Sequence, residues 1–119
     1  MILGIGTDII EVDRIRSAIE EHGDRFIERL FTEQEKKYCL KHRFPFRHFA
    51  GRFAAKEAIA KSFGLGFGKE ISWKDIEIVN DEKGKPIVYF QGERRDDIHI
   101  SISHCRQYAT ATAIICKLQ

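Results

Sequence analysis

The most constraining feature of the sequence is an alanine-rich stretch, FAGRFAAKEAIAKSF, at residues 49–63. Small and apolar side chains occupy almost every turn, so a helix over about 46–63 would be covered on most of its surface. Phe49, Phe53 and Glu57 recur every four residues and therefore share one face. A carboxylate in that row is costly to bury unless a cation or several hydrogen-bond donors meet it. We expect a buried helix that carries one unusual acid.

Other helices are expected before this one. An apolar run over residues 2–10 predicts a strand, in which Gly4 and Gly6 allow another backbone to approach closely. Helical periodicity then predicts a helix over Glu11–His22, stopped by Gly23, and a short helical piece over Asp24–Leu30. The sequence TEQE at 32–35 is typical of a capping box and predicts a helix that ends near His42, before a break at Pro45.

The second half of the chain is expected to form strands. The segments DIEIVN and IVYFQ predict a hairpin around the turn DEKGKP, and IHISISH and YATATAIIC alternate in the same way. Helices thus come mostly first and strands mostly later. The predicted fold class is α+β, an antiparallel sheet packed with helices, in one domain over residues 1–119.

Composition limits the class of protein. Hydrophobic residues make up 43% and charged residues 32%, which is ordinary for a soluble globular protein, and no apolar run is long enough to span a bilayer. The net charge of +2 gives no sign of a nucleic-acid partner. Three cysteines without metal-like spacing favour unpaired thiols in a reduced cytoplasm, and Cys105 has no flanking motif for nucleophilic work, so we expect it to be inert.

Two carboxylates are candidate ligands for a metal ion. Lys61 follows Glu57 by one helical turn, so an ordinary surface Glu–Lys pair is one interpretation of Glu57. Asp8 lies within the apolar sequence at the end of the first strand, where it would also suit a cap for the following helix. The alternative is that Asp8 and Glu57 converge across the fold. Magnesium prefers few carboxylates, keeps several waters and completes its shell with substrate phosphates.

Basic residues on the same helix suggest an anion site. Arg52 and Lys56 form an i, i+4 pair, and together with Lys61 and the glycine-rich loop Gly64–Gly68 they would make an anion-binding wall. Solvated lysines beside an ordinary loop are the alternative. His104 ends a strand, where a structural role and a contact to phosphate or ribose both remain open. The many basic residues between 14 and 47 form either a solvated surface or a docking face for an acidic partner.

Taken together, these segments resemble the bacterial holo-acyl-carrier-protein synthases, the small single-domain branch of the 4′-phosphopantetheinyl transferases. The resemblance runs along almost the whole chain. It is carried by GIGTDIIEVDRI at 4–15, FAGRFAAKEAIAKSFGLG at 49–66 and ISISHCRQYATA at 100–111, with RLFTEQEKKYC at 29–39 and GKPIVYFQG at 84–92 matching in place and order. The ordered combination of motifs is specific, although each fragment alone would not be.

The resemblance implies an activity and a set of partners. Enzymes of this family move the 4′-phosphopantetheine arm of coenzyme A to a serine of acyl carrier protein, release adenosine 3′,5′-bisphosphate and require magnesium. They support fatty acid biosynthesis and assemble as homotrimers with active sites at subunit interfaces. A nonenzymatic module that binds an acidic protein or nucleotide is the competing function. An RNA-binding domain is disfavoured by the modest charge and by the lack of an RNP-type motif.

The resemblance also implies roles for individual residues. The metal-binding carboxylates fall on Asp8 and Glu57, and the active-site lysine falls on Lys61, which would stabilise the departing bisphosphate. Glu57 would accept the serine proton directly or through a bound water. Contacts to coenzyme A fall on Arg52, Lys56, Gly64 and His104, and the carrier-binding basic residue falls on Arg14. Two positions depart from wider family patterns: Ile10 stands where larger relatives have a further acid, and Cys105 stands where a polar residue is expected.

Overall fold

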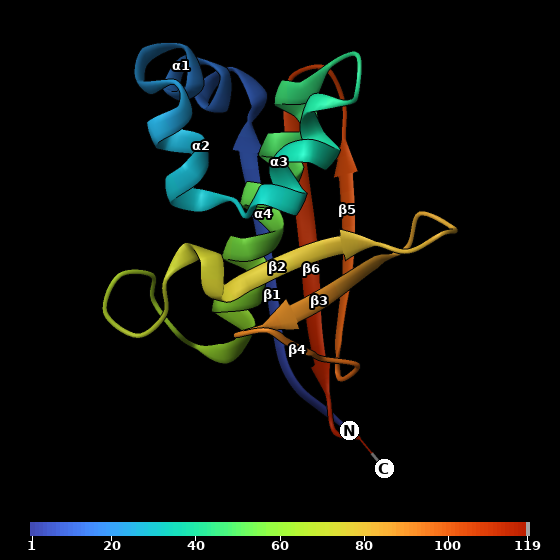
Figure 1. Ribbon diagram of the computed structural model, residues 1–119. Coiled ribbons are helices and arrows are strands. Elements are labelled where there is room, and N and C mark those ends of the chain that lie inside the picture. The colour runs from blue at the N-terminus through green and yellow to red at the C-terminus, as the bar shows by residue number, and fades with distance from the viewer. Residues whose placement is uncertain (119) are drawn as a thin grey trace.

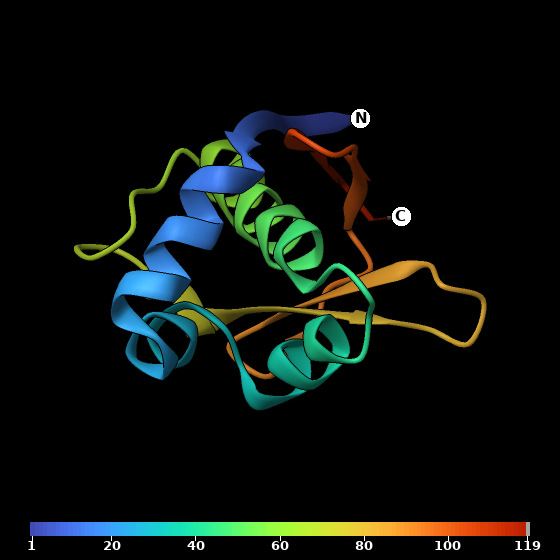
Figure 2. The ribbon, with the colours of Figure 1, turned by 90° about the horizontal axis from the view of Figure 1, so that it is seen from above.

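The alanine-rich segment forms helix α4, Pro45–Phe63, which lies in the middle of the molecule (Figure 2). The structure is a computed structural model and describes residues 1–118. Pro45 is the first residue of the helix, where its missing N–H costs no hydrogen bond. It therefore begins α4 and also ends the segment before it. Gly64 ends α4 in the left-handed conformation, with φ of 71°.

The remaining elements follow the expected order, as Figure 1 shows. They are β1 (Ile2–Glu11), α1 (Val12–His22), α2 (Asp24–Leu30), α3 (Glu33–Leu40), a 3₁₀ turn η1 (Trp73–Asp75), β2 (Ile76–Asn80), β3 (Pro86–Phe90), β4 (Glu93–Arg94), β5 (Ile98–His104) and β6 (Tyr108–Cys116). The predicted α+β class is confirmed. The turn η1 and the two-residue strand β4 were not expected from the sequence.

The strands form two antiparallel sheets where one was expected. The first sheet has the order β1-β6-β5, and the second has the order β2-β3-β4 and crosses the first at a steep angle in Figure 1. Seen from above in Figure 2, α4 lies between the two sheets, and α1, α2 and α3 cover one end. The chain ends lie together, because the Lys117 amide donates to the Met1 carbonyl over 2.9 Å.

Small residues bring α4 onto the first sheet. The inward positions of β6 are Ala109, Ala111 and Ala113, which are buried against the alanines of α4. On β1 the contact is closer still, because a Cβ atom at Gly6 would overlap the carbonyl oxygen of Ala58. A Cβ atom at Gly4 would overlap Ser62 in the same way. The expected close approach of a second backbone at these glycines is confirmed, and it places α4 side chains directly beside β1.

The outer face of β1 remains uncovered. Four large apolar side chains on this strand are about three-fifths exposed: Ile2, Leu3, Ile5 and Ile9. Leu3, Ile5 and Ile9 alternate with the positions of Gly4 and Gly6, which face α4, so these three side chains lie on the opposite side of the sheet. Within residues 1–118, no helix has the length and apolar character needed to cross a membrane.

Candidate functional site

Asp8 and Glu57 are neighbours in the folded chain. Asp8 lies within β1, paired with Ala111 of β6, and the residue before α1 is Glu11, so the alternative role of Asp8 as a helix cap is wrong. The pKa of Glu57 is raised, first by burial and then by the negative charge of Asp8. Two carboxylates that repel each other and lie at the end of an apolar surface favour a cation between or beside them.

Lys61 is the cation that this chain supplies to the pair. Its Nζ atom donates to Asp8 Oδ1 and to the Thr7 carbonyl, each over 3.1 Å. The Asp8 side chain is only 16% exposed, whereas that of Lys61 is 53% exposed. Lys61 thus pairs with Asp8 and not with Glu57, which lies one turn before it on α4. The interpretation of Glu57 as half of an ordinary Glu–Lys surface pair is not what the structure shows.

The row of residues that raised the question about Glu57 runs from the core to the surface. Phe49 is 1% exposed, Phe53 stacks on Trp73, Glu57 is half-buried, and Lys61 is largely exposed. The apolar start of the row anchors α4, and its charged end emerges beside β1. The sequence pattern is therefore that of a helix leaving the core at the acidic pair.

Arg52 lines a separate cavity of about 300 Å³ between α4, β5 and the β2–β3 turn. Although the residue is only 4% exposed, its guanidinium stacks over the Tyr38 ring, 4.2 Å from the centroid, and donates to the Asn80 side chain. Its Nε atom is buried and has no hydrogen-bond partner in the described structure. A buried arginine that lines a cavity and has one unpaired donor nitrogen is compatible with an anion site.

His104 lies on the same cavity, at the end of β5, together with His48 and Gly51. Burial lowers the pKa of His104, and the positive charges of Arg47 and His42 lower it further. Asn80, Tyr38 and His48 were not identified from the sequence, because nothing in their local pattern links them to Arg52. The only sequence signal for this cavity was the GKP turn at 84–86, which lies in one of the segments that resemble the family, because Gly84 and Pro86 line the cavity.

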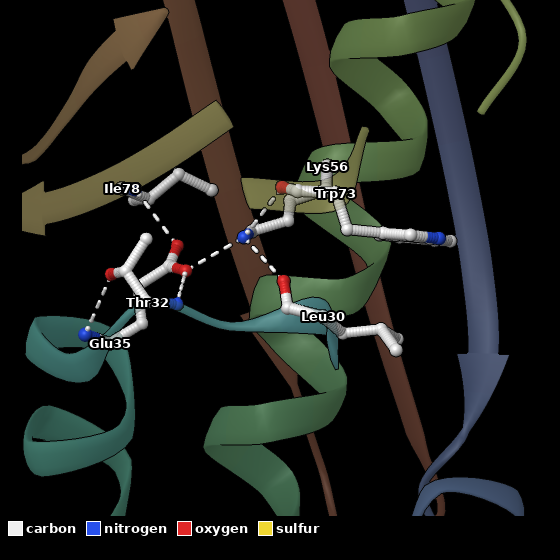
Figure 3. Close-up of polar contacts among 6 residues, drawn as sticks. All are labelled: Leu30, Thr32, Glu35, Lys56, Trp73 and Ile78. Atoms are coloured by element: carbon white, nitrogen blue, oxygen red, sulfur yellow. Dashed lines mark hydrogen bonds and ion pairs between the residues drawn. The ribbon is translucent and has the colours of Figure 1, made fainter. Parts of the chain in front are cut away.

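Lys56 does not contribute to any anion-binding surface in the chain, which corrects the sequence-based expectation. Its side chain is 0% exposed, and Nζ donates to Glu35 Oε1 at 2.7 Å, to the Leu30 carbonyl at 2.7 Å and to the Trp73 carbonyl at 3.0 Å (Figure 3). Its three protons therefore all have acceptors. The alternative of a solvated lysine is wrong for the same reason, and a direct contact from Lys56 to coenzyme A does not fit this arrangement.

Glu35 completes the buried network. It forms the expected capping box with Thr32, and its other carboxylate oxygen accepts from the Ile78 amide over 2.9 Å. Figure 3 shows these contacts converging from α3, α4, η1 and β2. Burial lowers the pKa of Lys56, and the charge of Glu35 opposes that shift. The network holds the second sheet and the α2–α3 connection against the central helix.

Several backbone amides of the glycine-rich loop after α4, which were expected to be exposed to a ligand, already donate hydrogen bonds within the chain. The Gly64 amide donates to the Lys61 carbonyl, and the Leu65 amide donates to the Ala60 carbonyl, which closes the end of the helix. The amide of Gly68 is used within the loop by Ile71. Gly64 itself is exposed, but its N–H is directed into the helix end. The expected wall of Arg52, Lys56, Lys61 and this loop does not form on one surface of a single chain.

Two further predicted residues lie at the surface. Arg14 is exposed on α1, which also carries the ion pair between Arg16 and Asp13 at 3.3 Å. Cys105 is exposed just after β5, and its pKa is lowered by the backbone amides of Gln107 and Tyr108. The expectation that Cys105 is inert stays a prediction, and exposure with a lowered pKa makes this thiol the one to test for reactivity.

The acidic pair suits a magnesium ion that is shared with a ligand. Within the described residues, no three His, Cys, Asp or Glu side chains gather into a metal-binding cluster. An all-protein cage is thus absent there, but magnesium does not require one, since it is commonly held by one or two carboxylates, waters and substrate phosphates. The hard oxygen donors of Asp8 and Glu57, and their mutual repulsion, fit that kind of site.

An acidic pair and a separate cavity lined by a buried arginine together suit a phosphorylated ligand bound with a metal ion. The sequence profile of the 4′-phosphopantetheinyl transferase superfamily matches residues 4–113. A holo-[acyl-carrier-protein] synthase of Protochlamydia amoebophila is 51% identical over 119 residues, which cover 96% of this chain and 98% of that protein. The chain therefore belongs to the 4′-phosphopantetheinyl transferase superfamily, within the group of holo-[acyl-carrier-protein] synthases.

Solved structures of the same group have the same fold. A holo-(acyl-carrier-protein) synthase of Bacillus anthracis in complex with CoA (3′,5′-ADP) is 42% identical, with a TM-score of 0.82, covering 97% of this chain and 96% of that one. The synthase of Helicobacter pylori in complex with coenzyme A is 32% identical, with a TM-score of 0.83, covering 94% of this chain and 99% of that one.

Proposed function

We propose that this protein transfers the 4′-phosphopantetheine arm of coenzyme A to a serine of apo-acyl carrier protein and releases adenosine 3′,5′-bisphosphate. Family membership over nearly the whole chain supports the reaction, and solved relatives of the same fold hold coenzyme A. The observation in this structure that carries the proposal is the acidic pair with Lys61 at its edge, accompanied by a cavity in which a buried arginine nitrogen is unpaired.

The acidic pair is proposed to hold the catalytic cation. Asp8 and Glu57 would bind magnesium, which supplies charge neutralisation at the pyrophosphate when bound. Glu57, whose pKa is raised, is proposed to accept the serine proton directly or through a bound water. The Lys61 side chain is half-exposed and its ammonium lies beside Asp8, where it is proposed to meet the charge that develops on the leaving bisphosphate.

The cavity beside Arg52 is proposed to bind the nucleotide end of coenzyme A. Arg52 and His104 both line this cavity, and Arg52 supplies its positive charge. Gly64 and Lys56 contribute in other ways: Gly64 ends the helix that carries Glu57, and buried Lys56 holds that helix against Glu35 of α3. Arg14, exposed on α1, is proposed to bind the acidic carrier protein.

A homotrimer with shared active sites is part of the proposal. In the first sheet β1 carries Asp8 at one edge, and β5 carries His104 at the other, with β6 between them. None of Asp8, Glu57 and Lys61 lines the Arg52 cavity. The acidic pair and the Arg52 cavity are thus two halves of a site. One coenzyme A molecule would contact both halves if the acidic pair of one subunit faced the cavity of the next. The uncovered apolar face of β1 is suited to such an interface.

Mass spectrometry of an apo carrier protein incubated with the enzyme, coenzyme A and magnesium tests the reaction directly. A gain of one phosphopantetheine group is expected with the wild-type protein. Asp8→Asn and Glu57→Gln should fold normally and lower the rate by about 100- to 1,000-fold. Glu93→Gln, an exposed carboxylate on β4, is the matched control and should retain full rate. Binding of coenzyme A without any mass gain would instead support the nonenzymatic module.

Subunit mixing tests the shared site. Asp8→Asn and Arg52→Ala should each be nearly inactive alone, because each removes one half of every site. When the two are unfolded together and refolded at equal amounts, about a quarter of the interfaces should combine two intact halves in a cyclic trimer. Recovery of roughly that fraction of wild-type activity is expected, and no recovery in a mixed trimer would contradict sharing. A cytoplasmic role in fatty acid biosynthesis is proposed along with this activity.

A further inference from the structure

Three histidine rings from separate segments meet beside the Arg52 cavity, and two of them, His48 and His104, line it. The rings of His42 and His48 are nearly parallel, with centroids 3.7 Å apart and an interplanar angle of 24°. The His104 ring meets His48 edge-on, with centroids 4.9 Å apart and an angle of 71°. His42 follows α3, His48 lies in the first turns of α4, and His104 ends β5, so the stack exists only in the folded chain.

The stack is surrounded by positive groups. His42 is held by a contact of 2.7 Å between its Nδ1 atom and the Tyr38 carbonyl, and the Tyr38 ring meets His48 edge-on at 5.7 Å. Burial, followed by the charges of His42, His104, Arg52 and Arg47 in that order, lowers the pKa of His48 to about 4. No carboxylate is among the groups that shift this pKa. His48 therefore stays neutral at physiological pH when no anion lies beside it.

A doubly negative ligand would reverse this balance. An anion in the cavity would lie against the His48 and His104 rings and against Arg52, whose buried Nε atom lacks an acceptor. Its charge favours the protonated form of any imidazole beside it. The His42 ring is stacked on His48, so it would keep the His48 ring in place beside the anion.

We propose that His48, supported by His42, is a proton-coupled ligand for a phosphomonoester group that enters the Arg52 cavity. The proton comes from solvent and goes to an imidazole nitrogen, and no covalent bond changes. Naming the ligand rests on the proposed function: coenzyme A carries one phosphomonoester, on its ribose, whereas its pyrophosphate is fully ionised near pH 7. The histidine stack would thus distinguish coenzyme A from a coenzyme that lacks this phosphate, and would bind it more tightly as the pH falls.

Calorimetry in two buffers of different ionisation enthalpy measures the protons exchanged on binding. The wild-type protein at pH 7 should take up protons when it binds coenzyme A, and take up fewer with 3′-dephospho-coenzyme A. Proton release by the ligand works in the opposite direction, because a phosphomonoester with a second pKa near 6 is mostly dianionic at pH 7. If a full proton is taken up, affinity should rise by up to about tenfold for each pH unit lowered.

His48→Phe keeps an aromatic ring in the stack but cannot bind a proton. It should lower the proton uptake and flatten the dependence of coenzyme A affinity on pH between about 7.5 and 6. His48→Gln is a second variant that serves if the phenylalanine disturbs folding, which a thermal melt reports. His22→Phe, at the end of α1 and beside Glu21, is the matched control and should behave like the wild type.

The outcomes separate this inference from the proposed function. Wild-type protein that binds coenzyme A and modifies the carrier without proton uptake would overturn the role of His48 and leave the transferase intact. Equal proton uptake by wild type and both His48 variants would also overturn it. A wild-type protein that neither binds coenzyme A nor modifies a carrier would contradict the proposed transferase function, and with it the inference that rests on that function. Loss of uptake only in the His48 variants would support the inference.

Discussion

Replacing Lys56 by methionine should destabilise the protein severely, although this lysine lies next to Glu57 in the sequence and resembles an active-site residue. Methionine has a similar length and fills the same space, so the change mainly removes charge and hydrogen bonds. What remains is the Glu35 carboxylate, which is 0% exposed and keeps only the backbone donors of Thr32 and Ile78. The carbonyls of Leu30 and Trp73 also lose the donor that Lys56 provided.

The size of the effect follows from these contacts. Removing one member of a buried ion pair costs about 3–5 kcal/mol, because the other charge is left without compensation. That is a large part of the roughly 5–15 kcal/mol by which domains are stable. For a chain of this length it corresponds to a melting temperature lowered by roughly 10–20 °C. The double variant Glu35→Gln with Lys56→Met removes both charges and should recover part of the loss.

Urea denaturation followed by circular dichroism gives the free energies of unfolding. All variants must be compared at one protein concentration, because assembly of subunits contributes to apparent stability. Lys74→Met, an exposed lysine beside Trp73, is the control and should change the free energy by less than about 0.5 kcal/mol. If Lys56→Met cost less than about 1 kcal/mol, or if the double variant lost the full sum of the two single changes, the buried network would not be the constraint described above.

Four other expectations can be checked with single variants or reagents. Gly6→Ala should lower the melting temperature, because its Cβ atom would overlap the backbone of α4. Arg14→Ala should raise KM for the carrier protein and leave KM for coenzyme A unchanged in steady-state kinetics. The free energy of unfolding should fall as the pH drops from 6.5 to about 4, since unfolded His48 binds a proton more readily than folded His48, and His48→Phe should flatten this fall. Cys105 should react with a thiol reagent in the folded protein, whereas Cys39, buried and with its pKa raised to about 12, should react only after unfolding.

Local patterns in the sequence predicted most of the secondary structure correctly. Alternation over 98–104 and 108–116 and the alanine-rich periodicity of α4 depend on neighbours within one segment, so they can be read before the fold is known. The capping box of Thr32 and Glu35 is of the same kind. Bounds shifted by a residue or two where the first residue of a helix depends on its surroundings, as at Pro45.

What a side chain faces was decided by the tertiary structure. Arg52 and Lys56 share a helical row, yet one lines a cavity and the other is enclosed by Glu35 and two carbonyls from distant segments. The stack of His42 and His48 against His104 also depends on segments that meet only on folding.

The sequence by itself was enough to predict the alanine-rich helix, the main strands and the family that the motifs resemble. It also showed that Glu57 interrupts an apolar row. Whether a charged group such as Lys56 or Lys61 meets solvent, ligand or a buried partner was settled only in three dimensions. Periodicity describes which side of its own element a residue occupies. The free energy of a charge depends instead on every group within a few ångströms, most of which come from elsewhere in the chain.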